Sequence, residues 1–83
     1  MHADFAQAVS ALEKAVSLSQ GREPQFLAAL ADGYSKAGRP ADAVQSARRA
    51  LDLALQFHDV KLQQKLREDI ARYENEKEKS KSR

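Results

Sequence analysis

The sequence predicts an all-α protein of antiparallel helical hairpins, with about four helices stacked as in an α-solenoid. Three observations predict this fold class. Apolar residues recur at helical spacing through most of the 83 residues. The stretch AGRPADAV, residues 37–44, places a glycine and a proline two residues apart between two such segments. Finally, Ala8 and Ala15 return as Ala43 and Ala50, a displacement of 35 residues, and a period in the thirties is typical of helical repeat arrays.

The first expected helix covers residues 3–19, and Gly21 is expected to cap its C-terminal end in the left-handed conformation. Its apolar side chains occupy a wide arc when residues are placed 100° apart around the helix axis. An arc this wide is typical of a helix with neighbours on two sides. The stripe consists of Ala8, Leu12 and Ala15, widened by Phe5, Val9 and Val16.

The second expected unit, residues 23–56, is a complete hairpin of two helices. Its first helix starts near Pro24, because the first helical turn leaves its N–H groups without intrahelical partners and proline lacks that N–H. Gly38 ends this helix and Pro40 begins the next, so AGRPADAV is predicted to be the corner of the hairpin. The residues that face each other across the hairpin are Leu27, Leu30, Ala31 and Tyr34 on the first helix and Ala43, Ala47 and Ala50 on the second.

The last expected helix covers residues 59–76, with Asp59 as its N-cap. Its apolar arc of about 80° is narrower than that of the first helix, which predicts a capping helix covered on one side only. The ending NEKEKSKSR, residues 75–83, contains no apolar side chain and alternates in charge at its start, so a disordered tail is expected at residues 77–83. The apolar stripe of the last helix consists of Leu62, Leu66, Ile70 and Tyr73.

Composition excludes several function classes. The chain has no cysteine, so it offers no disulfide, thiolate metal site or cysteine nucleophile. His2 falls in the terminal residues, and His58 is expected to be a capping or surface residue at a helix junction. Without a glycine-rich phosphate loop or a paired ligand motif, we expect no enzyme activity, cofactor or metal site. No apolar run approaches the roughly 18 residues of a membrane span, and the cytoplasm is favoured although the sequence fixes no compartment.

The net charge of +2 comes from residues 59–83, which hold eight basic and six acidic side chains. Basic residues suggest one alternative function, the weak electrostatic binding of nucleic acid or another anionic polymer through the C-terminal helix. Interleaved acidic residues and the lack of an aromatic stacking platform make nucleic acid the less favoured partner. The basic residues concerned are Arg48, Arg49, Lys61, Lys65, Arg67 and Arg72.

Residues 24–54, PQFLAALADGYSKAGRPADAVQSARRALDLA, resemble a tetratricopeptide repeat. The resemblance is carried by Leu30, Ala31 and Tyr34, by the turn around Gly38, and by Ala43 and Ala50 at close-contact positions. Ala47 departs from it, since an aromatic residue is often found there, and the proline that commonly ends a repeat is absent. The resemblance implies a tetratricopeptide-like fold: the second helix of an incomplete repeat at 3–19, a complete repeat at 23–56, and a capping helix at 59–76.

The ending ALDLALQFHDVKLQQKLREDIARYENEK, residues 50–77, resembles the final segment of bacterial multi-repeat proteins of this kind. Some of those are named O-linked glycosyltransferases for the likeness of their repeats. The resemblance implies the C-terminal end of a longer array and leaves open an accessory segment of a larger, glycosyltransferase-like enzyme. It also implies an open N-terminal face, where Phe5, Val9 and Val16 are expected to be partly uncovered and to promote self-association as a homodimer.

Tetratricopeptide arrays usually bind peptides on the concave face lined by their first helices. The resemblance therefore implies a non-catalytic scaffold module that binds a peptide or a partner helix. Lys61 and Lys65 lie four residues apart and form either a cationic edge of that face or the solvated side of a charged helix. The residues that map to the concave face are Gln25, Ala28, Asp32, Ser35 and Lys36 and, on the capping helix, Lys61, Gln64, Lys65 and Glu68.

Overall fold

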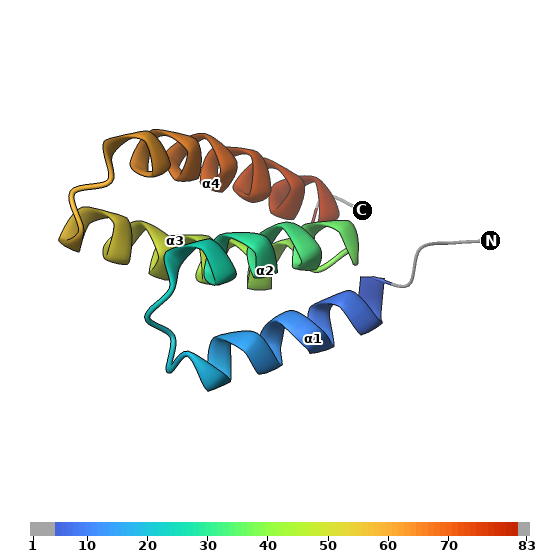
Figure 1. Cartoon of the computed structure of the whole chain (residues 1–83). Coiled ribbons are helices and arrows are strands. Elements are labelled where there is room, and N and C mark those ends of the chain that lie inside the picture. Colours follow the sequence, from blue (N-terminus) through green and yellow to red (C-terminus); the bar gives the residue numbers. More distant parts are fainter. Residues whose placement is uncertain (1–4, 82–83) are drawn as a thin grey trace.

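The computed structural model describes residues 5–81, and their backbone forms four α-helices (Figure 1). These are α1 (Phe5–Leu18), α2 (Pro24–Lys36), α3 (Pro40–Gln56) and α4 (Val60–Lys81). Within this range no residue is in a strand. Successive helices run in opposite directions and contact one another in chain order, so that α3 packs against both α2 and α4. The predicted all-α class of antiparallel hairpins is confirmed.

Two residues beyond the end of each of the first three helices lies a residue in the left-handed conformation: Gln20 (φ 60°), Gly38 (φ 81°) and His58 (φ 58°). The N–H of the following residue then donates to a carbonyl five residues back, as Arg39 does to Tyr34 at 2.8 Å. This geometry satisfies carbonyls that the last helical turn leaves without partners. His58, expected to be a capping or surface residue, is both exposed and in the capping position. At the end of α1, Gln20 occupies the capping position that was expected for Gly21, which follows it with φ 68°.

The stretch AGRPADAV forms the corner between α2 and α3, as predicted. Gly38 has φ 81° and open space around the position of a Cβ, so its backbone conformation alone favours glycine there. Pro40 is the first residue of α3, where a proline ring fits the helical φ and no N–H is needed. The apolar residues on the two sides of the corner consequently face each other.

The last helix begins as predicted and ends later than predicted. The Asp59 carboxylate accepts a hydrogen bond from the Leu62 N–H at 3.1 Å, which confirms the N-cap. The disordered tail expected at residues 77–83 is wrong for residues 77–81, because α4 continues to Lys81; residues 82 and 83 lie outside the described range. Glutamates at 74, 76 and 78 each precede a lysine by three residues, a spacing that stabilises a helix without any apolar contact.

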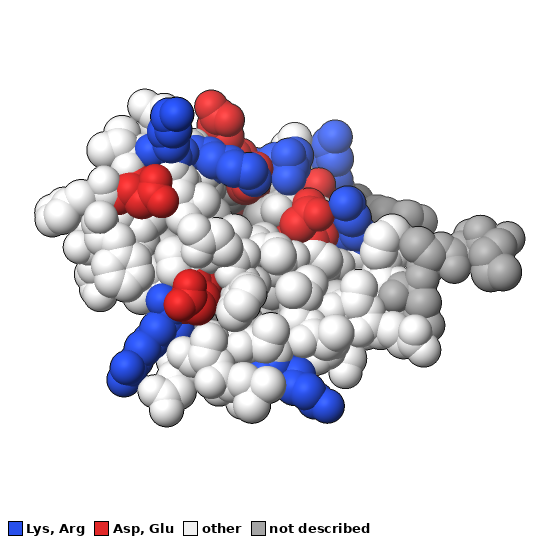
Figure 2. Space-filling model, viewed as in Figure 1, with Lys and Arg blue, Asp and Glu red and all other residues white. Residues whose placement is uncertain are grey.

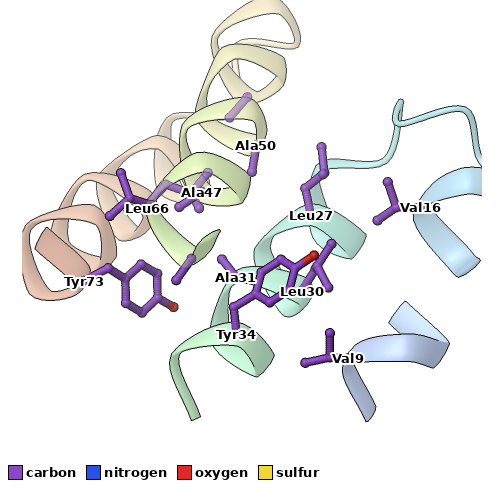
Figure 3. Packing of buried hydrophobic residues seen from close by; sticks show 13 residues of the cluster. Val9, Val16, Leu27, Leu30, Ala31, Tyr34, Ala47, Ala50, Leu66 and Tyr73 are labelled. Atoms are coloured by element: carbon purple, nitrogen blue, oxygen red, sulfur yellow. The ribbon is translucent and has the colours of Figure 1, made fainter. Parts of the chain in front are cut away.

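The core is centred on α3. Its residues Ala43, Ala47, Ala50 and Ala54 are all 0% exposed, as is Leu27 of α2. Because an alanine side chain is short, α2 and α4 approach α3 closely from two sides, and their larger side chains fill the space between the helices (Figure 3). Leu66 and Tyr73 of α4, each 1% exposed, complete this layer.

Of the described helices, α2 is the only one with which α1 makes extensive contact. Val9 and Val16 point toward α2 and are 3% and 8% exposed, so the expectation that both are partly uncovered is wrong; Phe5 at 37% is the exposed member of that set. A Cβ on Gly33 would lie 3.3 Å from Val9, which shows how closely the two helices approach. Residues 3 and 4, expected to be helical, lie outside the described range.

Candidate functional site

The strongest candidate site is a polar surface to which α2 and α4 both contribute. The Ser35 hydroxyl donates a hydrogen bond to the Glu76 carboxylate at 2.8 Å and joins the two helices across 41 residues of sequence. Residues three or four apart share one face of a helix, and each helix contributes such a row. We call this surface the α2–α4 face; it consists of Ala28, Asp32 and Ser35 of α2 and Lys65, Asp69, Arg72 and Glu76 of α4.

At the centre of the α4 row lies a nearly buried carboxylate. Asp69 is 8% exposed, and its two oxygens are shared between Lys65 Nζ at 2.8 Å and Arg72 Nη2 at 3.5 Å. The hydrogen bond to Asp69 raises the pKa of Lys65 above its ordinary value. A buried carboxylate without partners would be costly, and the two cations offset that cost. Both cations keep more than half of their side-chain surface in solvent, so they stay accessible to a partner.

Beneath these charges lies the ring of Tyr73. The Arg72 guanidinium stands over it with its carbon 5.1 Å from the ring centroid, a cation–π distance. Burial raises the pKa of Tyr73, and the negative charges of Asp69 and of Asp32 on α2 add to the effect. The two helices therefore influence each other electrostatically as well as through the serine–glutamate hydrogen bond.

The α2 row carries one further ion pair, between Lys36 Nζ and Asp32 at 3.0 Å. Both of these side chains are about half exposed. Exposed pairs of this kind contribute little to stability, so their charges are available for recognition.

Four of the nine residues expected at a partner-binding surface have defined polar contacts in the structure. Asp32, Ser35, Lys36 and Lys65 pair as described, and Ala28 is half-buried beside them. Four more are exposed, toward the starts of α2 and α4: Gln25, Lys61, Gln64 and Glu68.

Sequence reasoning missed Asp69, Arg72 and Glu76 as members of this surface. The spacing of 65, 69, 72 and 76 by four, three and four residues places them on one side of a helix, which was the available signal. The signal was weak because Asp69 interrupts the apolar stripe of α4 and looked like an ordinary exposed charge. Only the approach of α2 turns that side of α4 into half of a shared face.

The charge distribution is mixed rather than one-sided. Figure 2 shows acidic and basic side chains interspersed over α4, above a mostly uncharged surface that carries a few isolated charges. Among residues 5–81 no three acidic, histidine or cysteine side chains gather as metal ligands would. Within the same range no helix is both long and apolar enough to cross a membrane. The arrangement supports recognition by ion pairs and hydrogen bonds.

A second polar contact links α1 to the hairpin corner. The Tyr34 hydroxyl donates to the Glu13 carboxylate at 2.6 Å, and the Arg39 guanidinium lies over the Tyr34 ring at 4.6 Å. Burial, together with the hydrogen bond to Glu13, raises the pKa of Tyr34 to about 12. Arg39 also pairs with Asp42 at 2.8 Å. These contacts orient α1 on α2 and leave the α2–α4 face unobstructed.

Comparison with protein-family models, with curated proteins and with solved structures finds no match for this chain. The residues of the α2–α4 face, and the way in which two helices bring them together, are therefore the basis for a functional proposal.

Proposed function

We propose that this chain is a non-catalytic protein-interaction module of the tetratricopeptide type, which binds a peptide or a partner helix on the α2–α4 face. Three features support the type of repeat: the 35-residue displacement of Ala8 and Ala15 onto Ala43 and Ala50, the glycine–proline corner, and the fully buried alanines of α3. All three are what a close-packed helical repeat requires.

The observation that carries the proposal is the pre-formed polar surface shared by α2 and α4. Ser35 and Glu76 bind each other across the two helices, and Asp69 holds the exposed ends of Lys65 and Arg72 in place. Side chains fixed on rigid helices lose little further conformational entropy when a partner binds. Such a surface suits an extended peptide or a helix that brings both acidic and basic side chains.

The pairing of charges favours a mixed-charge partner over a polyanion. Lys65 and Arg72 share Asp69, and Arg48 pairs with Glu74. Cations already paired with carboxylates release fewer counterions when they meet a phosphate backbone, so nucleic acid gains less from them. Complementary acidic and basic groups on a protein partner can exchange with these pairs and fix its position along the helices.

The proposal is tested by selecting displayed peptides against the full chain and mapping the recovered peptides on it by NMR. We expect the amide signals around Asp32, Ser35 and Asp69 to shift together. Lys61→Glu is expected to change the affinity at least threefold, because Lys61 continues the α4 row from Lys65 by one turn. Arg67→Glu is the matched control: it makes the same charge change on the same helix at an exposed residue directed away from α2.

Two results would contradict the proposal. One is the recovery of peptides whose contacts lie elsewhere, or whose affinity responds equally to both variants. The other is single-stranded DNA that binds more tightly than any selected peptide and dissociates as the salt concentration rises, which is the behaviour of a phosphate-binding surface.

A further inference from the structure

Helix α1 has an apolar face that no described helix covers. The residues on it follow one another by three, four and three positions, so they share one side of the helix. Three of the four are exposed, Leu18 to 79%, and Ala15 is half-buried. We call this face the open stripe; it consists of Ala8, Ala11, Ala15 and Leu18.

The same pattern recurs 35 residues later on α3, where it is covered. Three of the corresponding positions hold the same residue, and the fourth pairs Ala11 with Ser46. On α3 the two alanines are 0% exposed and Ser46 is 6% exposed. We call this set the covered stripe; it consists of Ala43, Ser46, Ala50 and Leu53.

The helix that covers this stripe on α3 is α2. Arg48 of α3 pairs with Glu74 of α4, whereas Arg49 Nη2 lies 2.8 Å from the position that a Cβ on Gly21 would take, in the turn that leads into α2. Adjacent helical residues point 100° apart, so α4 and α2 lie on different sides of α3. The covered stripe lies on the Arg49 side and therefore faces α2.

We propose that the open stripe of α1 docks an amphipathic helix of the same kind as α2. Such a helix carries leucine and aromatic side chains at the spacing of Leu27, Leu30 and Tyr34 and runs antiparallel to α1. Three of the four side chains that α2 covers on α3 are repeated, largely uncovered, on α1, and the fourth is an alanine in place of a serine. This second surface is chemically distinct from the α2–α4 face, and the inference holds whether or not that face binds a peptide.

A helix with bulky residues fits the open stripe better than a second copy of α1 does. Stable protein interfaces bury about 800 Å² on each partner, and two stripes that each hold three alanines and one leucine present little side-chain surface. Leucine and tyrosine side chains supply the missing apolar area, just as those of α2 fill the space beside the alanines of α3 (Figure 3). Small residues on one helix and large residues on its neighbour pack most closely.

The test uses a synthetic peptide of residues 22–39, blocked at both ends, titrated to millimolar concentration into the isotope-labelled full chain. We expect saturable NMR shifts at the amides of the open stripe. Ala11→Glu is expected to weaken this binding at least tenfold, because it places a charge in the centre of the stripe. Ser10→Glu, at the neighbouring exposed position on the polar side of α1, is expected to change it less than twofold.

Circular dichroism of both variants is the check that they keep the helical fold, so that a loss of binding reports on the face itself. The proposal is overturned if the peptide leaves α1 unshifted, if its shifts lie on α3 or on the α2–α4 face, or if both variants respond alike. It is also overturned if the chain sediments as a dimer that Ala11→Glu converts to a monomer, because a second copy would then be the occupant.

Discussion

Replacing Ala43 with leucine tests the packing of the two helices at the hairpin. Ala43 is 0% exposed on the side of α3 that faces α2, and Leu30 and Ala31 toward the same end of the hairpin on α2 are 4% and 1% exposed. Leucine adds three carbon atoms where the surface of both helices is already inaccessible to solvent. Overpacking of this kind forces side chains out of their rotamers or moves the backbone and costs about 1 to 3 kcal/mol.

This cost is large relative to the stability of so small a chain. At roughly 0.05 to 0.15 kcal/mol per residue, 83 residues correspond to about 4 to 12 kcal/mol of unfolding free energy. A loss of 1 kcal/mol lowers the Tm of a domain of this size by about 4 to 8 °C. Ala43→Leu is therefore expected to lower the Tm by at least about 4 °C.

The assay is urea unfolding of both proteins followed by circular dichroism at 222 nm, with thermal melts in parallel. Ala41→Leu is the matched control because it adds the same atoms two residues earlier on the same helix, at an exposed position. Its unfolding free energy is expected to stay within about 0.5 kcal/mol of the parent chain. If Ala43→Leu unfolds at the same urea concentration as Ala41→Leu, the close α2–α3 contact at Ala43 is refuted.

Three further predictions concern polar contacts. Since the folded state keeps the Tyr34 phenol protonated, the free energy of unfolding should fall as the pH rises from 10 through about 12, and it should fall less in Tyr34→Phe. Glu13→Gln should shift the titration of Tyr34, followed by absorbance at 295 nm, to lower pH. An unchanged titration would argue against the hydrogen bond between Tyr34 and Glu13. Asp69→Leu should leave the unfolding free energy unchanged or raise it by up to about 1 kcal/mol, because Lys65 and Arg72 return to water. If urea unfolding instead shows that this variant loses more than about 2 kcal/mol of unfolding free energy, the ion pairs stabilise the fold. Asp59→Ala should cost about 1 kcal/mol in the same assay through the lost N-cap, whereas Asp59→Asn, which keeps a capping oxygen, should cost less.

Local signals were enough to predict the helices and the corners. Pro24, Gly38, Pro40 and Asp59 act on their own turn of backbone, so their roles can be inferred without knowing what packs nearby. The C-terminal end of α4 was mispredicted because the lack of apolar residues was weighed above helix propensity. Glutamate and lysine at three-residue spacing extend a helix that is already nucleated by packing at its other end.

Which side of a helix is covered could not be inferred from its own sequence. The apolar arc of α1 predicted two neighbours, and α2 covers the half that holds Val9 and Val16. The edge of the arc with Ala8 and Ala15 was equally apolar in the sequence, yet Ala8 is exposed and Ala15 only half-buried. An arc gives the total apolar width, whereas the covered half depends on where the partner helix sits, which is a long-range property.

Asp69 shows the same limitation for the candidate site. By sequence it interrupts an apolar stripe and has a lysine four residues before it, as many exposed helix charges do. In the structure it is nearly buried, and Tyr73 and Glu76 on the same side of α4 lie close to Asp32 and Ser35. The α2–α4 face exists because two helices that are separated by the whole of α3 in the sequence come together in space, and no local spacing encodes that contact.

The two surfaces proposed here differ in what their partners must supply. The α2–α4 face has its charges paired across and along the helices, so a partner gains by exchanging ion pairs, and its affinity should respond to salt. The open stripe of α1 has no charge to offer, so its partner gains by burying leucine and aromatic side chains, and its affinity should be nearly independent of salt. Because α1 reaches the rest of the molecule through α2, a helix docked on α1 adds a layer beside the α2–α4 face without occupying it. Salt dependence measured for each partner separately thus distinguishes the two surfaces even before either is mapped.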